Sequence, residues 1–143
     1  MKVRSNLKGK SNGISFVVAY SPTESHKSVP DKALFWATQG SAVAEVPQGE
    51  HLLAMMDTNA RTGPRGEDCV DDKVLGAYGR DTLNHNGRLL LAFSAENQLD
   101  LVNTLSSAPR HRISYTFQSP NRGKGLYRLD FTLTRQPDRQ LVR

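Results

Sequence analysis

Two short apolar runs with a helical segment between them constrain the fold of this chain most strongly. Residues 13–20 are rich in β-branched and aromatic side chains and end at a Ser-Pro turn, and residues 51–56 end abruptly at Asp57. Both runs are predicted as buried strands. Ser28, just before the apolar-periodic residues 32–46, predicts the start of a helix. This order predicts an α/β fold with a mixed sheet.

The second half of the chain is predicted to add one helix and three strands. The leucine-rich residues 88–98 follow helical spacing, and residues 99–103, 114–117 and 128–134 are predicted strands. Residues 59–79 are rich in Gly, Asp and Arg and are predicted to form a long loop, which in a compact domain is usually functional or disordered. The 143 residues fit one domain, and we expect it to be cut in mid-domain.

Charge and cysteine content narrow the class of protein. The net charge of +5 favours an anionic partner such as nucleic acid, although a basic domain without such a partner has the same balance. A single cysteine, Cys69, allows no intrachain disulfide and favours a reducing compartment. Residues 1–10 lack the apolar core of a signal peptide, and no run reaches the ~18 apolar residues of a membrane span. We therefore expect an intracellular protein, nuclear or cytoplasmic, without a membrane partner.

The segment Met-Asp-Thr-Asn-Ala-Arg-Thr-Gly at residues 56–63 carries the sharpest chemical signal. Functional groups in α/β sheets gather at the carboxyl ends of strands, and a carboxylate such as Asp57 there suits Mg²⁺. The amide of Asn59 is expected to point the same way along an extended backbone, where it can donate to a phosphate oxygen or orient a water. A plain Asx turn at a strand end accounts for the same residues without any function.

Two other residues are candidates for the same chemistry. The hydroxyl of Tyr20, at the end of the first strand, can contact a phosphate, although an ordinary strand-end aromatic is the alternative. Asp130 interrupts an apolar strand, so we expect it to be buried and to need a partner. It is then either a salt-bridge residue or the orienter of a catalytic histidine.

The order of the motifs along the chain is more specific than any single motif. Tyr-x-Pro follows the first strand, Asp-x-Asn-Ala-Arg-Thr-Gly follows the second, and four further motifs come after them. These are Asn-x-Asn-Gly at 84–87, Leu-x-Leu-Val-Asn-Thr at 99–104, Tyr-Thr-Phe at 115–117 and Arg-Leu-Asp-Phe-x-Leu at 128–133. This series resembles the endonuclease/exonuclease/phosphatase superfamily, in particular the apurinic-type endonuclease domains of non-LTR (LINE-type) retrotransposons and of craniofacial-development-protein-2-like relatives. The resemblance runs from about Ile14 to the C-terminus.

The resemblance implies a four-layered α/β sandwich, with mixed sheets packed face to face and helices outside, of which residues 1–143 form a part truncated at both ends. It implies hydrolysis of DNA phosphodiesters with Mg²⁺ or Mn²⁺. By resemblance, Asp57 binds the metal and positions the attacking water, and Asn59 holds the scissile phosphate. Tyr20 contacts the phosphate, and Asp130 pairs with a catalytic histidine.

Basic side chains are expected to contact the nucleic acid. The predicted substrate-binding residues are Arg61, Arg122 and Lys124. A nucleic-acid-binding surface could also include Lys8, Lys10, Arg65, Arg110 and Arg112.

Two groups of the family's active site have no counterpart in these residues. The metal-binding glutamate of the family precedes the Tyr-x-Pro strand, but residues 1–13 contain no Asp or Glu. The catalytic histidine follows the Arg-Leu-Asp strand, but no histidine follows His111. Losing one such group commonly raises the reaction barrier by about 3–5 kcal/mol, so we expect the activity to be impaired. The remaining histidines, His26, His51 and His85, match no catalytic position either.

Two alternatives to an endonuclease stay open. One is a catalytically inactive remnant that still binds nucleic acid. The other is a phosphatase acting on small phosphoesters or lipids, against which the basic charge argues. Without flanking strands, we also expect exposed sheet edges to favour self-association.

Overall fold

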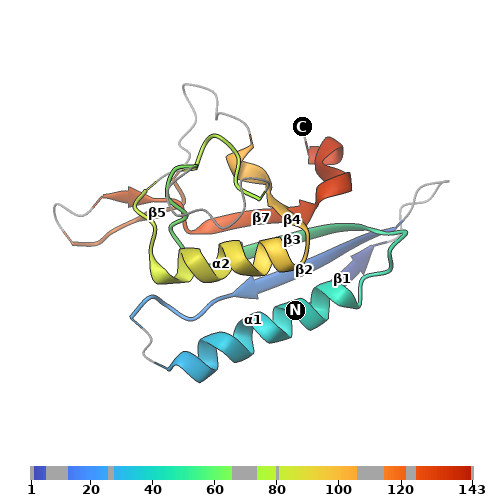
Figure 1. Cartoon of the computed structure of the whole chain (residues 1–143), viewed down its shortest axis with the longest axis horizontal. Helices are drawn as coiled ribbons and strands as arrows, with labels where there is room; N and C mark the ends of the chain where they lie inside the picture. The colour runs from blue at the N-terminus through green and yellow to red at the C-terminus, as the bar shows by residue number, and fades with distance from the viewer. Residues whose placement is uncertain are drawn as a thin grey trace.

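The computed structural model describes residues 2–5, 13–25, 28–65, 74–79, 81–105, 115–121 and 125–142. Strands and helices alternate along the chain (Figure 1). The elements are β1 (Lys2–Ser5), β2 (Ile14–Tyr20), α1 (Val29–Ala44), β3 (His51–Asp57), α2 (His85–Glu96), β4 (Leu99–Leu101), the 3₁₀ helix η1 (Val102–Thr104), β5 (Phe117–Gln118), β6 (Leu126–Tyr127), β7 (Asp130–Arg135) and the 3₁₀ helix η2 (Gln136–Val142).

The main sheet contains five strands in the order β1-β2-β3-β7-β4. Strands β2 and β3 are parallel and are connected through α1, whereas the other neighbouring pairs are antiparallel. Strands β5 and β6 form a separate antiparallel pair. The prediction of an α/β fold with a mixed sheet is therefore confirmed.

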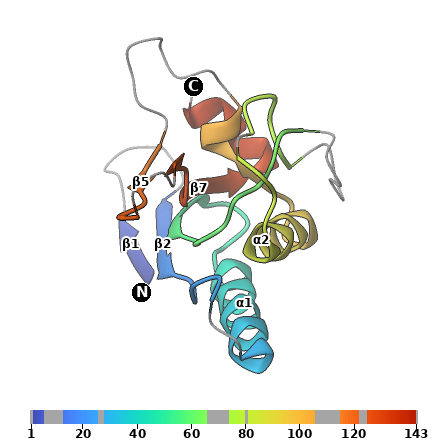
Figure 2. The same ribbon diagram turned by 90° about the vertical axis from the view of Figure 1, so that its left-hand side faces the viewer.

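Both helices lie on one face of the main sheet (Figure 2). Directly paired residues of neighbouring strands share a face, and on this face Val17, Ala54, Leu133 and Leu101 form a buried row across β2, β3, β7 and β4. Burying each such aliphatic side chain larger than alanine contributes about 1.5–3 kcal/mol. Trp36 of α1 joins this core together with Phe93 of α2, at a ring-centroid distance of 4.9 Å. The hydrophobic contact between helix layer and sheet thus holds the strands in register.

The opposite face of the sheet is covered unevenly. At one end η2 lies on it, where Arg139 forms an ion pair with the buried Asp100 at 2.7 Å. At the other end Val18 is 37% exposed and Met55 is 40% exposed. Within the described ranges no helix covers this end. The described residues thus supply the five-stranded sheet, the separate β5–β6 pair and one layer of helices, and self-association stays a prediction.

Helix starts depend on capping residues. Ser28 caps α1 as predicted, and its hydroxyl accepts a hydrogen bond from the Asp31 amide at 3.3 Å. Because the cap lies at Ser28, α1 begins at Val29, ahead of the apolar-periodic residues 32–46. Asn84 caps α2 and accepts from the Gly87 amide at 2.8 Å, so α2 also begins before the predicted residue 88.

Strand lengths differ from the predictions in the second half. The strand expected over residues 99–103 ends at Leu101, where the backbone turns into η1. The strand expected at 114–117 is Phe117–Gln118 within the described residues, and that expected at 128–134 is β7. Of the long loop at 59–79, the described parts 59–65 and 74–79 contain neither helix nor strand. No helix in the described part of the chain is long and apolar enough to cross a membrane.

Candidate active site

Three residues predicted from separate motifs lie side by side in the sheet. Tyr20, the last residue of β2, pairs with Asp57, the last residue of β3. Asp57 in turn pairs with Asp130, the first residue of β7. Paired residues project to the same face, here the face that the helices leave open. The fold therefore brings two carboxylates and a phenol together at the carboxyl ends of β2 and β3, on the left in Figure 1.

The Asp57 carboxylate is partly buried at the edge of a hollow. The hollow has a volume of about 500 Å³ and is also lined by Asp130, Asn103 and Thr116. Burial raises the pKa of Asp57 above its ordinary value, the hydrogen bond from the Asn59 amide opposes this shift, and the negative charge of Asp130 adds to it. Asp57 thus holds its proton more readily than an exposed aspartate does.

Asn59 reaches the site by a different backbone path from the one predicted. Its φ is 47°, in the left-handed region, and β3 has already ended at Asp57, so the expectation of an extended backbone is wrong. The Asn59 amide N–H donates to Asp57 Oδ1 at 3.1 Å, which makes an Asx-type turn. Asn59 Nδ2 donates to the Ser21 carbonyl oxygen at 3.0 Å. Asn59 therefore connects the ends of β2 and β3. The Asx-type turn is itself part of the candidate site.

Two more asparagines fix the loop that follows β3. Asn84 Oδ1 accepts from the Arg61 amide at 2.8 Å while it also caps α2. The Asn86 side-chain amide donates to the carbonyl oxygen of Pro22 at 2.9 Å and to that of Asn59 at 3.4 Å. The Asn-x-Asn-Gly motif thus ties the N-terminus of α2 to the ends of both parallel strands.

Asp130 is exposed, and the expectation that it is buried is wrong. It opens β7 on the uncovered face of the sheet, so the solvent reaches its carboxylate. Among the described residues no ion pair involves it. Its backbone is held instead, because Thr116 Oγ1 accepts from the Asp130 amide at 3.1 Å and Asn103 Nδ2 donates to the Asp130 carbonyl oxygen at 2.9 Å.

Asn103 and Thr116 belong to two of the motifs above, but the sequence assigns neither residue a role in the site. The sequence predicts Thr116 only as part of a structural strand, and it places Asn103 at the end of one. The available signal was a polar side chain directly after Leu101-Val102 for Asn103, and one between two aromatic residues for Thr116. The group with which such a side chain forms a hydrogen bond depends on the tertiary structure.

The predicted DNA-binding side chains are described only in part. The Arg61 guanidinium lies over the Tyr127 ring, 5.2 Å from its centroid, and thereby connects the loop after β3 to β6. Arg65 is exposed in the same loop. The other predicted basic residues lie outside the described residues: Lys8, Lys10, Arg110, Arg112, Arg122 and Lys124.

The two described histidines take structural positions. His51 Nδ1 lies 2.8 Å from Asp138 Oδ1, at the opposite end of β3 from Asp57. His85 begins α2, where its backbone amide donates to the Glu24 carboxylate at 3.2 Å. His26, His111 and Cys69 lie outside the described residues.

The oxygen donors of the site fit a hydrated magnesium ion. Mg²⁺ binds proteins through one or two carboxylates and fills its octahedral shell with water and phosphate oxygens. Asp57 and Asp130 supply two such carboxylates. Across the described ranges, no group of three or more His, Cys, Asp or Glu residues lies together. The donor set therefore suits an open Mg²⁺ site and not a closed four-ligand zinc site.

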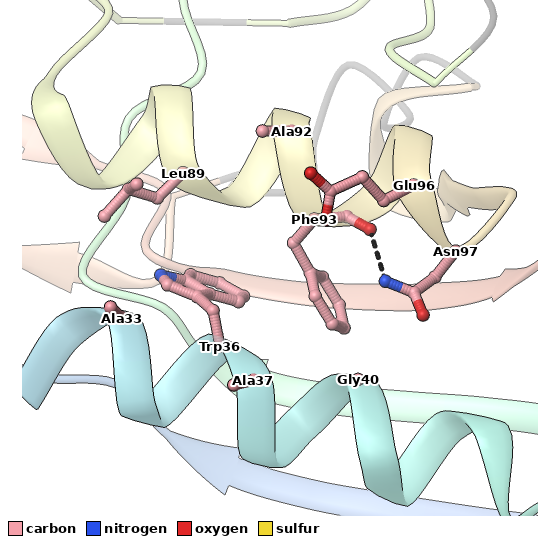
Figure 3. A pocket seen from close by; sticks show the side chains of 9 residues that line it. All are labelled: Ala33, Trp36, Ala37, Gly40, Leu89, Ala92, Phe93, Glu96 and Asn97. Carbon is pink, nitrogen blue, oxygen red and sulfur yellow. Dashed lines mark hydrogen bonds between the residues drawn. The ribbon is translucent and has the colours of Figure 1, made fainter.

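A second hollow of about 470 Å³ lies between the two helices (Figure 3). Trp36 and Phe93 form its inner wall, and small residues such as Ala37 and Gly40 form its rim. Asn97 at one end donates to the Phe93 carbonyl oxygen at 2.8 Å. This hollow presents a mostly apolar surface on the helix side of the sheet, so it offers no acid–base pair for the chemistry considered above.

Comparisons with known proteins agree with part of the resemblance. The chain is 28% identical over 138 residues to craniofacial development protein 2 of Bos taurus, covering 95% of the chain and 22% of that protein. It is 26% identical over 136 residues to craniofacial development protein 2 of Tragulus javanicus, with the same coverage. The chain thus spans about a fifth of the length of these relatives. No protein-family model matches it.

Proposed function

We propose that this chain carries the core of a magnesium-dependent DNA endonuclease site of the retroelement type. The observation that carries the proposal is the register of three strands, which aligns Tyr20, Asp57 and Asp130 in one row. The similarity to craniofacial development protein 2 supports the relationship on which the motif comparison rests. The names of these relatives state no activity, so hydrolysis and the DNA substrate are inferred from the site.

Each residue has a chemical role in this proposal. Asp57 and Asp130 would hold a Mg²⁺ ion, which would neutralise charge on the phosphate oxygens. Asp57 would also position the attacking water beside the metal. One N–H of the Asn59 side-chain amide donates to the Ser21 carbonyl oxygen, and the second N–H would donate to a phosphate oxygen. The exposed Tyr20 hydroxyl donates to another.

These 143 residues hold no counterpart of the family's metal-binding glutamate or catalytic histidine, and this lowers the rate of DNA cleavage that we expect. Each charged catalytic group commonly contributes two to four orders of magnitude. The chain by itself is therefore expected to cleave DNA slowly.

Binding of nucleic acid without hydrolysis is the second candidate. It is favoured by the two-carboxylate donor set, since the described residues offer no third acidic or histidine ligand. The net charge of +5 and the Arg61 side chain beside the site supply attraction for phosphates without any catalysis.

Cleavage of supercoiled plasmid separates the two candidates. The full chain is incubated with plasmid in Mg²⁺ and in EDTA, beside Asp57→Asn and the control Glu96→Gln, which removes one negative charge on the helix side. An endonuclease nicks the plasmid only with the metal, loses this in Asp57→Asn and keeps it in Glu96→Gln. If the folded wild-type chain shifts DNA in a gel but never nicks it, the binding remnant is the correct function. Release of phosphate from small phosphoesters without nicking would favour the phosphatase alternative.

A further inference from the structure

Asp130 occupies a position in β7 that lacks a neighbouring strand on one side. Strand β4 pairs with β7 from Leu99 to Leu101, and Leu101 lies opposite Leu133. Beyond this point the chain turns into η1, so the pairing stops three residues before Asp130 is reached. A backbone carbonyl left without a partner at the end of a ladder gives a strand freedom to fray.

The Asn103 side chain supplies the hydrogen bond to Asp130 that β4 does not reach. It lies in η1, directly after β4, and its Nδ2 donates to the Asp130 carbonyl oxygen at 2.9 Å. Asn103 is itself fixed, because its own carbonyl oxygen accepts from Arg128 Nη1 at 2.9 Å. On the other side, β3 pairs with β7 up to Asp57 opposite Asp130. The start of β7 is thus held by β3, by the Asn103 side-chain amide and by the Thr116 hydroxyl, which accepts from the Asp130 amide.

The orientation of the Asn103 amide carries a cost in free energy. Only the nitrogen can donate to the Asp130 carbonyl oxygen, so Oδ1 must point the other way. Oδ1 is buried and has no hydrogen-bond partner. A buried acceptor without a donor is destabilising, and an apolar side chain of the same size would avoid it. Leucine would avoid this cost but would leave the Asp130 carbonyl oxygen without its donor, so asparagine is needed here for the bond to Asp130.

We infer that Asn103 is a positioning residue for the metal site, which holds the Asp130 carboxylate beside that of Asp57 so that both can bind one cation. The inference rests on the proposed function. Asn103 lines the same hollow as both carboxylates, which places it next to the group on which it acts. It contacts neither the cation nor the substrate in this role, since it acts through the backbone of Asp130.

The test compares metal affinity with stability in the full chain. The dissociation constant for Mn²⁺ alone is measured by calorimetry in wild type, Asn103→Leu and the control Asn97→Leu, and thermal unfolding is recorded for each. Asn97 is a matched control because it is also partly buried and donates one bond from Nδ2 to a backbone carbonyl, at the far end of α2. Asn103→Leu is expected to raise the dissociation constant about tenfold, as loss of an outer-shell partner does, while its melting temperature falls no more than that of Asn97→Leu.

A double-mutant cycle shows whether the effect passes through Asp130. In an Asp130→Asn background, Asn103→Leu is expected to change the Mn²⁺ affinity no further, because the carboxylate it positions is gone. An unchanged dissociation constant in Asn103→Leu, or the same tenfold loss in the Asp130→Asn background, overturns the inference and leaves the proposed function intact. If wild type binds no Mn²⁺, or if Asp57→Asn binds it equally well, the proposed metal site is wrong and the inference falls with it.

Discussion

Asp57 and Asp130 lie opposite each other on the antiparallel strands β3 and β7, on the face of the sheet that the helices leave open. They are 73 positions apart in the sequence, and only the register of the sheet makes them neighbours. Two carboxylates at adjacent positions repel each other unless a proton or a cation lies between them. This relationship links the fold to the proposed chemistry, and the pH behaviour of the site follows from it.

Replacing Asp130 should lower the pKa of Asp57. Burial is the larger cause of the raised pKa of Asp57, and the charge of Asp130 adds to it. The variant Asp130→Asn removes the charge and leaves the burial, so the pKa of Asp57 is expected to fall but to stay above its ordinary value. An NMR titration that follows the Asp57 side-chain carbon measures this. No change in Asp130→Asn would show that the two carboxylates do not interact.

The same raised pKa predicts how stability depends on pH. A carboxyl whose pKa is higher in the folded than in the unfolded state binds its proton more tightly when folded. Its contribution to stability is fully present below the ordinary pKa of 3.8 and is lost as the pH rises through the folded-state pKa. Asp57→Asn mimics the protonated form and escapes this loss. The melting temperature of the variant minus that of wild type should therefore increase from below pH 3.8 to neutral pH, and a flat or falling difference would contradict the account.

Gly87 should tolerate no side chain. A Cβ at this position in the first turn of α2 would lie 2.0 Å from the Arg61 carbonyl oxygen, so the loop after β3 or the helix must move. Gly87→Ala is expected to destabilise the fold by about 1–3 kcal/mol, as overpacking commonly does. Gly40→Ala in α1 should instead stabilise by about 0.5–1 kcal/mol, because its Cβ would lie 4.0 Å from the nearest neighbour, Asn97 Oδ1. Urea unfolding of both variants measures the contrast, and equal effects would argue against the close approach.

The two helix caps should differ in their effect on the site. Ser28→Ala removes only the cap of α1 and is expected to cost about 1 kcal/mol of stability. Asn84→Ala removes the cap of α2 and also the acceptor for the Arg61 amide, so about 1–3 kcal/mol is expected. Any plasmid nicking should survive Ser28→Ala but decrease in Asn84→Ala, because the loop carrying Asn59 loses its anchor. A loss of nicking that is equal in both variants would mean that overall stability alone sets the rate.

Local sequence patterns predict the elements that depend on local physics. The apolar runs ending at Tyr20 and Asp57 are strands because β-branched and aromatic side chains pack well on a half-buried pleated surface. Ser28 predicts a helix start because its hydroxyl satisfies an amide within the same turn. Tyr20 and Asp57 are found in this way because each ends such a run, and Asp130 is found because it interrupts one.

Local sequence patterns do not show which distant segments pair with each other. The residues around Asp130 do not indicate that it pairs with Asp57, because strand register is fixed by the packing of the whole sheet. The exposure of Asp130 was mispredicted for the same reason: the uncovered face is a property of the assembled layers. The side-chain bond from Asn103 to Asp130 also forms only after β4 and β7 have paired.

The location of a bound metal ion tests the central claim most directly. Paramagnetic Mn²⁺ broadens the NMR signals of nearby amides, and it is added in small amounts to the isotopically labelled full chain. The account predicts broadening centred on the ends of β2 and β3 and the start of β7, around Tyr20, Asp57 and Asp130, and its loss in Asp57→Asn. Broadening centred elsewhere, or none at these three strand ends, would contradict the assignment of this row of residues as a metal-dependent phosphodiester site.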